Sequence, residues 1–111
     1  MVRRVEEWLA QHYRELHAVS GAVEASGIPD RSLKRRFKTA TGLTLMAHVQ
    51  NLRIEGAKRL LETNRASADE ISATVGYENP AFFRRLFKRC TGLSPGAYRR
   101  MFQPLSNPTP H

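Results

Sequence analysis

The chain has 111 residues, which is enough for one ordinary domain or two very small ones. Its 18 lysine and arginine residues against 10 aspartate and glutamate residues give a net charge of +8, which favours a polyanionic partner such as nucleic acid or an anionic membrane surface. One cysteine excludes an intramolecular disulfide framework, and the lack of an 18-residue apolar run excludes a membrane-spanning helix.

Helical periodicity and end signals predict seven helices and no strand, so the expected fold class is all-α. The first helix has the clearest apolar face, formed by Val5, Trp8, Leu9, His12, Tyr13 and Leu16. The expected helices run over about 3–15, 19–26, 31–41, 44–63, 68–75, 80–91 and 95–101.

Local signals indicate where the later helices begin. Ser67 and Glu70 are the two ends of a capping-box sequence, which places a helix start near residue 68. Asn79 and Pro80 combine a preferred N-cap residue with a proline at the first helical position. The helix over 44–63 is the longest, and twenty helical residues span roughly 30 Å, enough to connect two small modules.

The chain contains an internal repeat, in which LKRRFKTATGLTLMAH (33–48) aligns with FRRLFKRCTGLSPGAY (83–98) at an offset of 50. Phe37 aligns with Phe87, and a Thr-Gly-Leu sequence follows four residues later in both copies. Each copy contains a short helix, a turn with glycine and a second helix, which is the pattern of a helix-turn-helix. The helix over 44–63 would join two such modules.

The second helix of each copy carries a basic face opposite its apolar face. In the first copy this face consists of Arg31, Lys34, Arg35 and Lys38. In the second copy the same spacing gives Ala81, Arg84, Arg85 and Lys88. Neither helix has an acidic residue between its first and last stripe position, so the like charges repel each other unless an anion compensates them. Phosphate groups of nucleic acid would supply that compensation.

The segment VGYENPAFFRRLFKRCTGLSPGAYRRMF (75–102) closely resembles the signature at the end of the AraC/XylS-type transcriptional regulators. That signature is a glycine-aromatic pair, an acidic or Asn-Pro turn, F-x-R-x-F-K-R and then G-x-S-P-x-x-Y-R. LRIEGAKRLLE (52–62) resembles the connecting helix of the family, and the resemblance covers about 4–102. It implies a DNA-binding domain of two helix-turn-helix modules joined by a long helix, whose recognition helices enter adjacent major-groove segments.

The resemblance also implies which residues contact DNA. The base-reading positions of the family fall on Arg31, Lys34, Arg35, Pro80, Ala81, Arg84 and Arg85. Arginine suits this role because its fork pairs with O6 and N7 of guanine. Lys38 and Lys88 lie one turn further on, where phosphate is the expected contact. The helices that start near Thr44 and Ser94 can donate backbone N–H groups to phosphate.

The first copy departs from the family pattern in three places. Pro29, followed by Asp30, stands where the family has an N-cap serine. The G-x-S-P sequence is replaced by residues 42–45, which lack proline, and His48 stands where the second copy has Tyr98. The first module is therefore the less typical of the two.

Several side chains outside the basic faces have other expected roles. Cys90 lies on the side predicted to be buried, so a core thiol is expected rather than a nucleophile. Arg36 aligns with Leu86, which favours a seam between helices over a phosphate contact, and Arg53 is either a structural anchor or a contact to the DNA backbone. We expect Phe82 to pack on a neighbouring helix.

We therefore predict a sequence-specific, double-stranded DNA-binding domain of a transcription regulator, in the bacterial cytoplasm at the nucleoid. No catalytic constellation is present and the histidines lack metal-ligand spacing, so no enzyme activity, cofactor or metal is expected. The expected parts are helix 1 with the first module (1–43), the connecting helix (44–64), the second module (65–102) and a disordered tail (103–111).

Two alternative functions use the same residues. A basic amphipathic helical module would bind an anionic membrane surface or a protein partner, and its phenylalanine rings would then be exposed. An enzyme fragment would need catalytic groups that the sequence does not offer.

The second half of the chain is also similar to regulators whose effector domain resembles the DJ-1/PfpI fold. We expect that N-terminal domain to be missing here, and any dimer to form through it.

Overall fold

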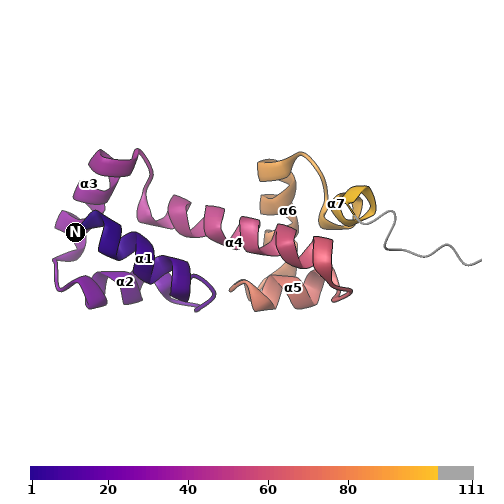
Figure 1. Ribbon diagram of the computed structural model, residues 1–111, viewed down its shortest axis with the longest axis horizontal. Coiled ribbons are helices and arrows are strands. Elements are labelled where there is room, and N and C mark those ends of the chain that lie inside the picture. The colour runs from indigo at the N-terminus through magenta and orange to yellow at the C-terminus, as the bar shows by residue number, and fades with distance from the viewer. Residues whose placement is uncertain (103–111) are drawn as a thin grey trace, which may run out of the picture. The chain divides into compact units, whose positions relative to one another are not determined.

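The computed structural model describes residues 1–102, which form seven helices and no strand (Figure 1). The helices are α1 (Val2–His12), α2 (Ala18–Ser26), α3 (Asp30–Thr41), α4 (Leu45–Thr63), α5 (Ala68–Thr74), α6 (Pro80–Thr91) and α7 (Pro95–Phe102). This arrangement confirms the all-α class with two helix-turn-helix modules and a long helix between them. The tail expected to be disordered over 103–111 lies outside the described residues.

The chain divides into two compact units, Met1–Arg53 and Ile54–His111, and the boundary falls inside α4. The first half of α4 contributes Leu45 and Val49 to one core, and the second half contributes Ala57 to the other. The same helix therefore supplies a packing surface to each unit. The four-part division expected from the sequence, with the connecting helix as a part of its own, stays a prediction.

The first unit packs α1, α2 and α3 around one apolar core. Its buried residues are Val5, Leu9, Tyr13, Ala18, Ala22, Leu33, Phe37, Leu45 and Val49. Trp8 packs against this core, and its ring stacks on His12 with the ring centroids 4.0 Å apart. Gly21 of α2 faces the indole, because a Cβ at this position would lie 2.6 Å from Trp8 Cη2. A larger residue at position 21 would therefore displace the tryptophan.

The first helix ends at His12, three residues earlier than the sequence predicts. Beyond it, the Arg53 guanidinium donates hydrogen bonds to the carbonyl oxygens of Tyr13 and Glu15, at 2.7 Å from Nε and 2.7 Å from Nη2. Leu16, expected on the apolar face, is 49% exposed because it lies past the end of the helix. Arg53 itself is buried, so of the two roles left open for it the structure supports the anchor.

The second unit packs α5, α6 and α7 against the second half of α4. Its buried residues are Ile54, Ala57, Leu61, Ile71, Val75, Tyr77, Phe83, Leu86, Phe87 and Tyr98. The Tyr98 ring meets the Phe87 ring edge-on, with centroids 5.4 Å apart, and the Tyr98 hydroxyl donates a hydrogen bond to Glu62. Arg99 Nη2 donates to the carbonyl oxygen of Asn64 at 3.0 Å. These contacts attach α7 to the C-terminal end of α4.

The buried Arg53 guanidinium should be required for the stability of the first unit. Arg53→Ala leaves two carbonyl oxygens without their donor, so we expect the free energy of unfolding to fall by about 2–4 kcal/mol. Trp8, the one tryptophan of the chain, lies in this unit and reports its unfolding in urea by fluorescence.

The matched control is Arg59→Ala, since Arg59 is an exposed arginine on the same helix. This change should alter the free energy of unfolding by less than about 0.5 kcal/mol. Equal losses for the two variants would contradict the anchor role of Arg53.

Burial, the hydrogen bond to Glu62 and the negative charges of Glu62 and Glu55 together raise the pKa of Tyr98 from 10.0 to about 12. The unfolded chain therefore loses this proton near pH 10, whereas the folded chain keeps it until the pH approaches 12. The stabilisation is complete below pH 10 and is lost as the pH rises through the folded pKa. By about pH 11 we expect the free energy of unfolding to have fallen by roughly 1 kcal/mol from this group.

Tyr98→Phe isolates this contribution, because the variant lacks the Tyr98 hydroxyl and is otherwise identical. Urea unfolding followed by helical circular dichroism at about pH 9 and about pH 11 should show the smaller decline in the variant. The same decline in both proteins would mean that the folded state does not hold the Tyr98 proton.

Candidate nucleic-acid interface

The helices α3 and α6 each bury one face and expose the opposite one. Phe37 and Phe87 occupy equivalent places in the two helices, and both are 0% exposed. Leu33 and Phe83 lie one turn earlier and are equally buried. The apolar faces expected opposite the basic ones are therefore confirmed, and packing fixes which face of each helix points outward.

The basic residues expected on the outer faces are exposed on both helices. The α3 cationic face consists of Arg31, Lys34, Arg35 and Lys38. The α6 cationic face consists of Arg84, Arg85 and Lys88, with Ala81 at its start. Residues spaced by three and four positions share one side of a helix, so the cations of each face lie together within their own unit.

The same hydrogen-bonded turn follows both helices. In the first copy, Gly42 has a left-handed φ of 80° and donates its N–H to the carbonyl oxygen of Lys38. Thr41 Oγ1 lies 2.8 Å from the carbonyl oxygen of Phe37 and 3.1 Å from the amide nitrogen of Leu43. The same threonine contacts recur 50 residues later, again at 2.8 and 3.1 Å. The repeat in the sequence is therefore also a repeat of atomic contacts.

Thr44 and Ser94 cap the helices that follow these turns. Thr44 Oγ1 accepts a hydrogen bond from the amide of Ala47 at 3.0 Å, and Ser94 Oγ accepts one from the amide of Ala97 at 3.1 Å. Both capping residues are exposed. Because their hydroxyl groups accept the capping hydrogen bonds, an anion at these helix starts would be bound by backbone N–H groups. Pro95 has no N–H group to offer.

The starts of α3 and α6 differ, as the departures in the first copy predict. Asn79 Oδ1 accepts hydrogen bonds from the amides of Ala81 and Phe82, at 2.9 and 3.1 Å, and Pro80 occupies the first position of α6. The residue before α3 is Pro29, which provides no side-chain cap. The first turn of α6 is therefore the more firmly held.

Acidic side chains contact both cationic faces, contrary to the interpretation that the stripes are free of acid. Asp30 pairs with Lys34 at 3.1 Å, one turn along α3. Asp69 of α5 accepts a hydrogen bond from Arg84 Nη2 of α6. The i,i+4 spacing could have indicated the first pair, whereas the second joins residues 15 positions apart on different helices. Arg85 has no ion pair with any residue from 1 to 102.

Two predictions of buried side chains are wrong. Cys90 is exposed, because the last turn of α6 extends past the core of its unit. Arg36 is exposed as well, so it forms no seam between helices, although the equivalent Leu86 is only 3% exposed. Phe82 is 38% exposed. Its ring centroid lies 5.6 Å from that of Tyr77, a residue of the segment between α5 and α6.

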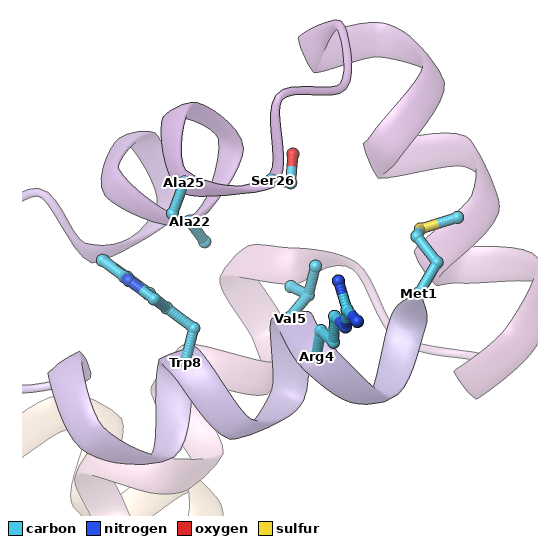
Figure 2. Close-up of a pocket in the computed structure, with 7 residues that line it drawn as sticks. All are labelled: Met1, Arg4, Val5, Trp8, Ala22, Ala25 and Ser26. Carbon is cyan, nitrogen blue, oxygen red and sulfur yellow. The ribbon is translucent and has the colours of Figure 1, made fainter.

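A hollow of about 470 Å³ lies between α1 and α2 (Figure 2). Its lining is Met1, Arg4, Val5, Trp8, Ala22, Ala25 and Ser26, none of which belongs to a cationic face. Figure 2 shows the Trp8 side chain extending from α1 towards α2. Within residues 1–102, no group of three His, Cys, Asp or Glu side chains could hold a metal ion. Among the helices described, none has the length and apolar character needed to cross a membrane.

Several known proteins are similar to this chain. A family model described as a helix-turn-helix domain matches residues 22–101. The MmsAB operon regulatory protein of Pseudomonas aeruginosa is 42% identical over 65 residues, which are 59% of this chain and 21% of that protein. The bifunctional transcriptional activator/DNA repair enzyme AdaA of Bacillus subtilis is 31% identical over 98 residues, which are 87% of this chain and 46% of that protein. This chain thus spans less than half the length of either relative.

A solved structure shares the fold over nearly the whole chain. The DNA-binding domain of AdpA, a global transcriptional factor, was solved in complex with a target DNA. It superposes with a TM-score of 0.87 at 30% identity and covers 97% of both chains. These similarities confirm the resemblance carried by residues 75–102. The chain belongs to the AraC-type family of helix-turn-helix domains of transcription regulators.

Proposed function

We propose that the chain is the DNA-binding domain of a transcription regulator and binds duplex DNA in a sequence-specific manner. The helices α3 and α6 act as recognition helices and enter adjacent segments of the major groove. The residues that contact base edges are Arg31, Lys34, Arg35, Ala81, Arg84 and Arg85. Phosphates are bound by Lys38, by Lys88 and by the helix starts at Thr44 and Ser94.

One observation carries this proposal. A helix with a fully buried phenylalanine and an exposed cationic face occurs twice, and the same turn and cap follow it each time. A basic helix that binds a membrane surface gains no specificity from a second copy. A protein that binds duplex DNA gains a second set of base contacts from the second helix. Side chains held by a packed helix also lose less freedom when they bind than side chains on a mobile segment.

The burial of the phenylalanine rings weighs against a membrane-surface module. Such a module inserts an exposed apolar face beside its basic one. Phe37, Phe83 and Phe87 are each 0% exposed, so their helices have no apolar face to insert. Phe82 is the one ring of α6 that is open to solvent, and a single half-exposed ring is a small anchor.

We further propose that the domain acts without catalysis and without a cofactor, in the bacterial cytoplasm at the nucleoid. Any dimer forms through an N-terminal effector domain outside this chain. AdaA is named as an activator and a repair enzyme, and this chain matches 46% of its length. Ligand recognition and the choice between activation and repression belong to the effector domain in this proposal.

Arg85 should determine sequence specificity, because it is exposed on the α6 cationic face and has no ion pair within residues 1–102. The operator is first obtained by selecting bound sequences from a pool of random duplexes. Arg85→Ala should then weaken binding to the operator by about 1–3 kcal/mol more than it weakens binding to random duplex, where only the charge of Arg85 contributes. Fluorescence anisotropy at one salt concentration measures both affinities.

Equal losses on operator and random duplex would exclude a base contact at Arg85. The selection itself tests the proposed function, since a sequence-specific DNA-binding domain must enrich a defined sequence. Tight binding to anionic liposomes, with no sequence enriched from the pool, would replace the proposal by the membrane-surface alternative.

Lys88 should act on all sequences alike, because a phosphate contact carries no base information. Lys88→Ala is expected to weaken binding to operator and random duplex by the same factor. It should also make the slope of log affinity against log salt shallower by about 0.9, the contribution of one neutralised phosphate. Arg59→Ala, outside both cationic faces, is the control and should leave the slope unchanged. A loss confined to the operator would assign Lys88 to a base instead.

A further inference from the structure

An acidic side chain of α5 holds one of the exposed arginines of the α6 cationic face. Asp69 accepts a hydrogen bond from Arg84 Nη2, although the two side chains are 58% and 48% exposed. Pairs so open to solvent contribute little to stability. The contact with Asp69 therefore matters less for stability than for the groups that Arg84 can bind.

The contact leaves most of the donors of Arg84 available. A guanidinium has five N–H donors in a planar fork, and the hydrogen bond to Asp69 engages Nη2. The remaining edge can still pair with O6 and N7 of a guanine. A guanidinium held at one corner has fewer orientations to lose when it pairs with a base. The neighbouring carboxylate also repels phosphate, so it lowers the attraction of this arginine to the DNA backbone.

The equivalent position of the first module shows the same combination. Lys34 lies 50 residues before Arg84, and its ammonium group pairs with Asp30 at 3.1 Å. The next residue in each copy, Arg35 or Arg85, has no ion pair within residues 1–102. Different elements supply the acid in the two modules, α3 itself in one and α5 in the other. The two acid–base pairs at the equivalent positions 34 and 84 therefore do not result from the same sequence spacing.

We propose that Asp69 is a positioning residue that raises sequence specificity through Arg84. It orients the guanidinium for a base edge and reduces its pairing with phosphates. This inference rests on the function proposed above.

The test compares Asp69→Asn with the wild type on the selected operator and on random duplex, over a range of salt concentrations. One more cation becomes free for phosphate, so affinity for random duplex should rise about five- to tenfold near 0.1 M salt. The slope against log salt should steepen by about 0.9. Operator affinity should not rise, so the ratio of operator to random affinity falls about fivefold or more.

Three further variants separate positioning from charge and from stability. Glu78→Gln makes the same change in net charge at an exposed residue just before α6, and its affinity ratio should stay within about twofold of the wild type. Asp69→Glu keeps the carboxylate and should restore most of the ratio. In an Arg84→Ala background, Asp69→Asn should no longer change the ratio, which shows that it acts through Arg84.

The inference is overturned if Asp69→Asn leaves the affinity ratio unchanged, or if Glu78→Gln lowers the ratio equally. It is also overturned if Asp69→Asn acts in the Arg84→Ala background as it does in the wild type. In each of these cases the wild type still prefers its operator, so the proposed function stands. A wild type with no preference for any duplex would instead refute the proposed function.

Discussion

Burial of Phe37 and Phe87 is the interaction on which both modules depend. Complete burial of a phenylalanine side chain stabilises a fold by about 1.5–3 kcal/mol, whereas an exposed ion pair contributes about 0–1 kcal/mol. The ring therefore sets the rotation of its helix about the helix axis, and the charges follow. The hydroxyl groups of Thr41 and Thr91 donate hydrogen bonds to the carbonyl oxygens of these two phenylalanines, so the turn after each helix is held to the same residue. The exposed cationic faces are thus a consequence of packing on the opposite side.

The two modules reach the same arrangement through different secondary contacts. In the second, Tyr98 fills the place beside Phe87 and bonds to Glu62, which links α7 to α4. In the first, the shorter His48 meets the Phe37 ring edge-on at 5.3 Å. There the anchor is a charged group instead, since Arg53 binds two carbonyl oxygens beyond α1. The repeat preserves the helix, the turn and the cap, while each unit closes its core in its own way.

The sequence predicts best the features that local chemistry decides. The helix expected over about 80–91 is observed as Pro80–Thr91, since Asn79 before it and Gly92 after it are local signals. The end of α1 was missed because the chain turns there, with the Glu15 N–H donating to the carbonyl oxygen of His12, and Arg53, 38 residues from Glu15, binds the segment beyond the turn. The apolar and basic faces followed from comparing the two copies in register. The contact between Asp69 and Arg84 could not be predicted, because only the packing of α5 on α6 brings them together.

The modules also differ in how their cations are held, and this difference bears on the proposed function. The second begins with a side-chain cap and carries an arginine restrained by Asp69, where the first has Lys34 after an uncapped start. An arginine fork discriminates bases by geometry, whereas a lysine ammonium acts as a point charge. A fixed helix start and a restrained fork both reduce the entropy lost on binding a base. Under the proposed function, Arg84 therefore discriminates bases more sharply than Lys34 does at the equivalent position of the first module.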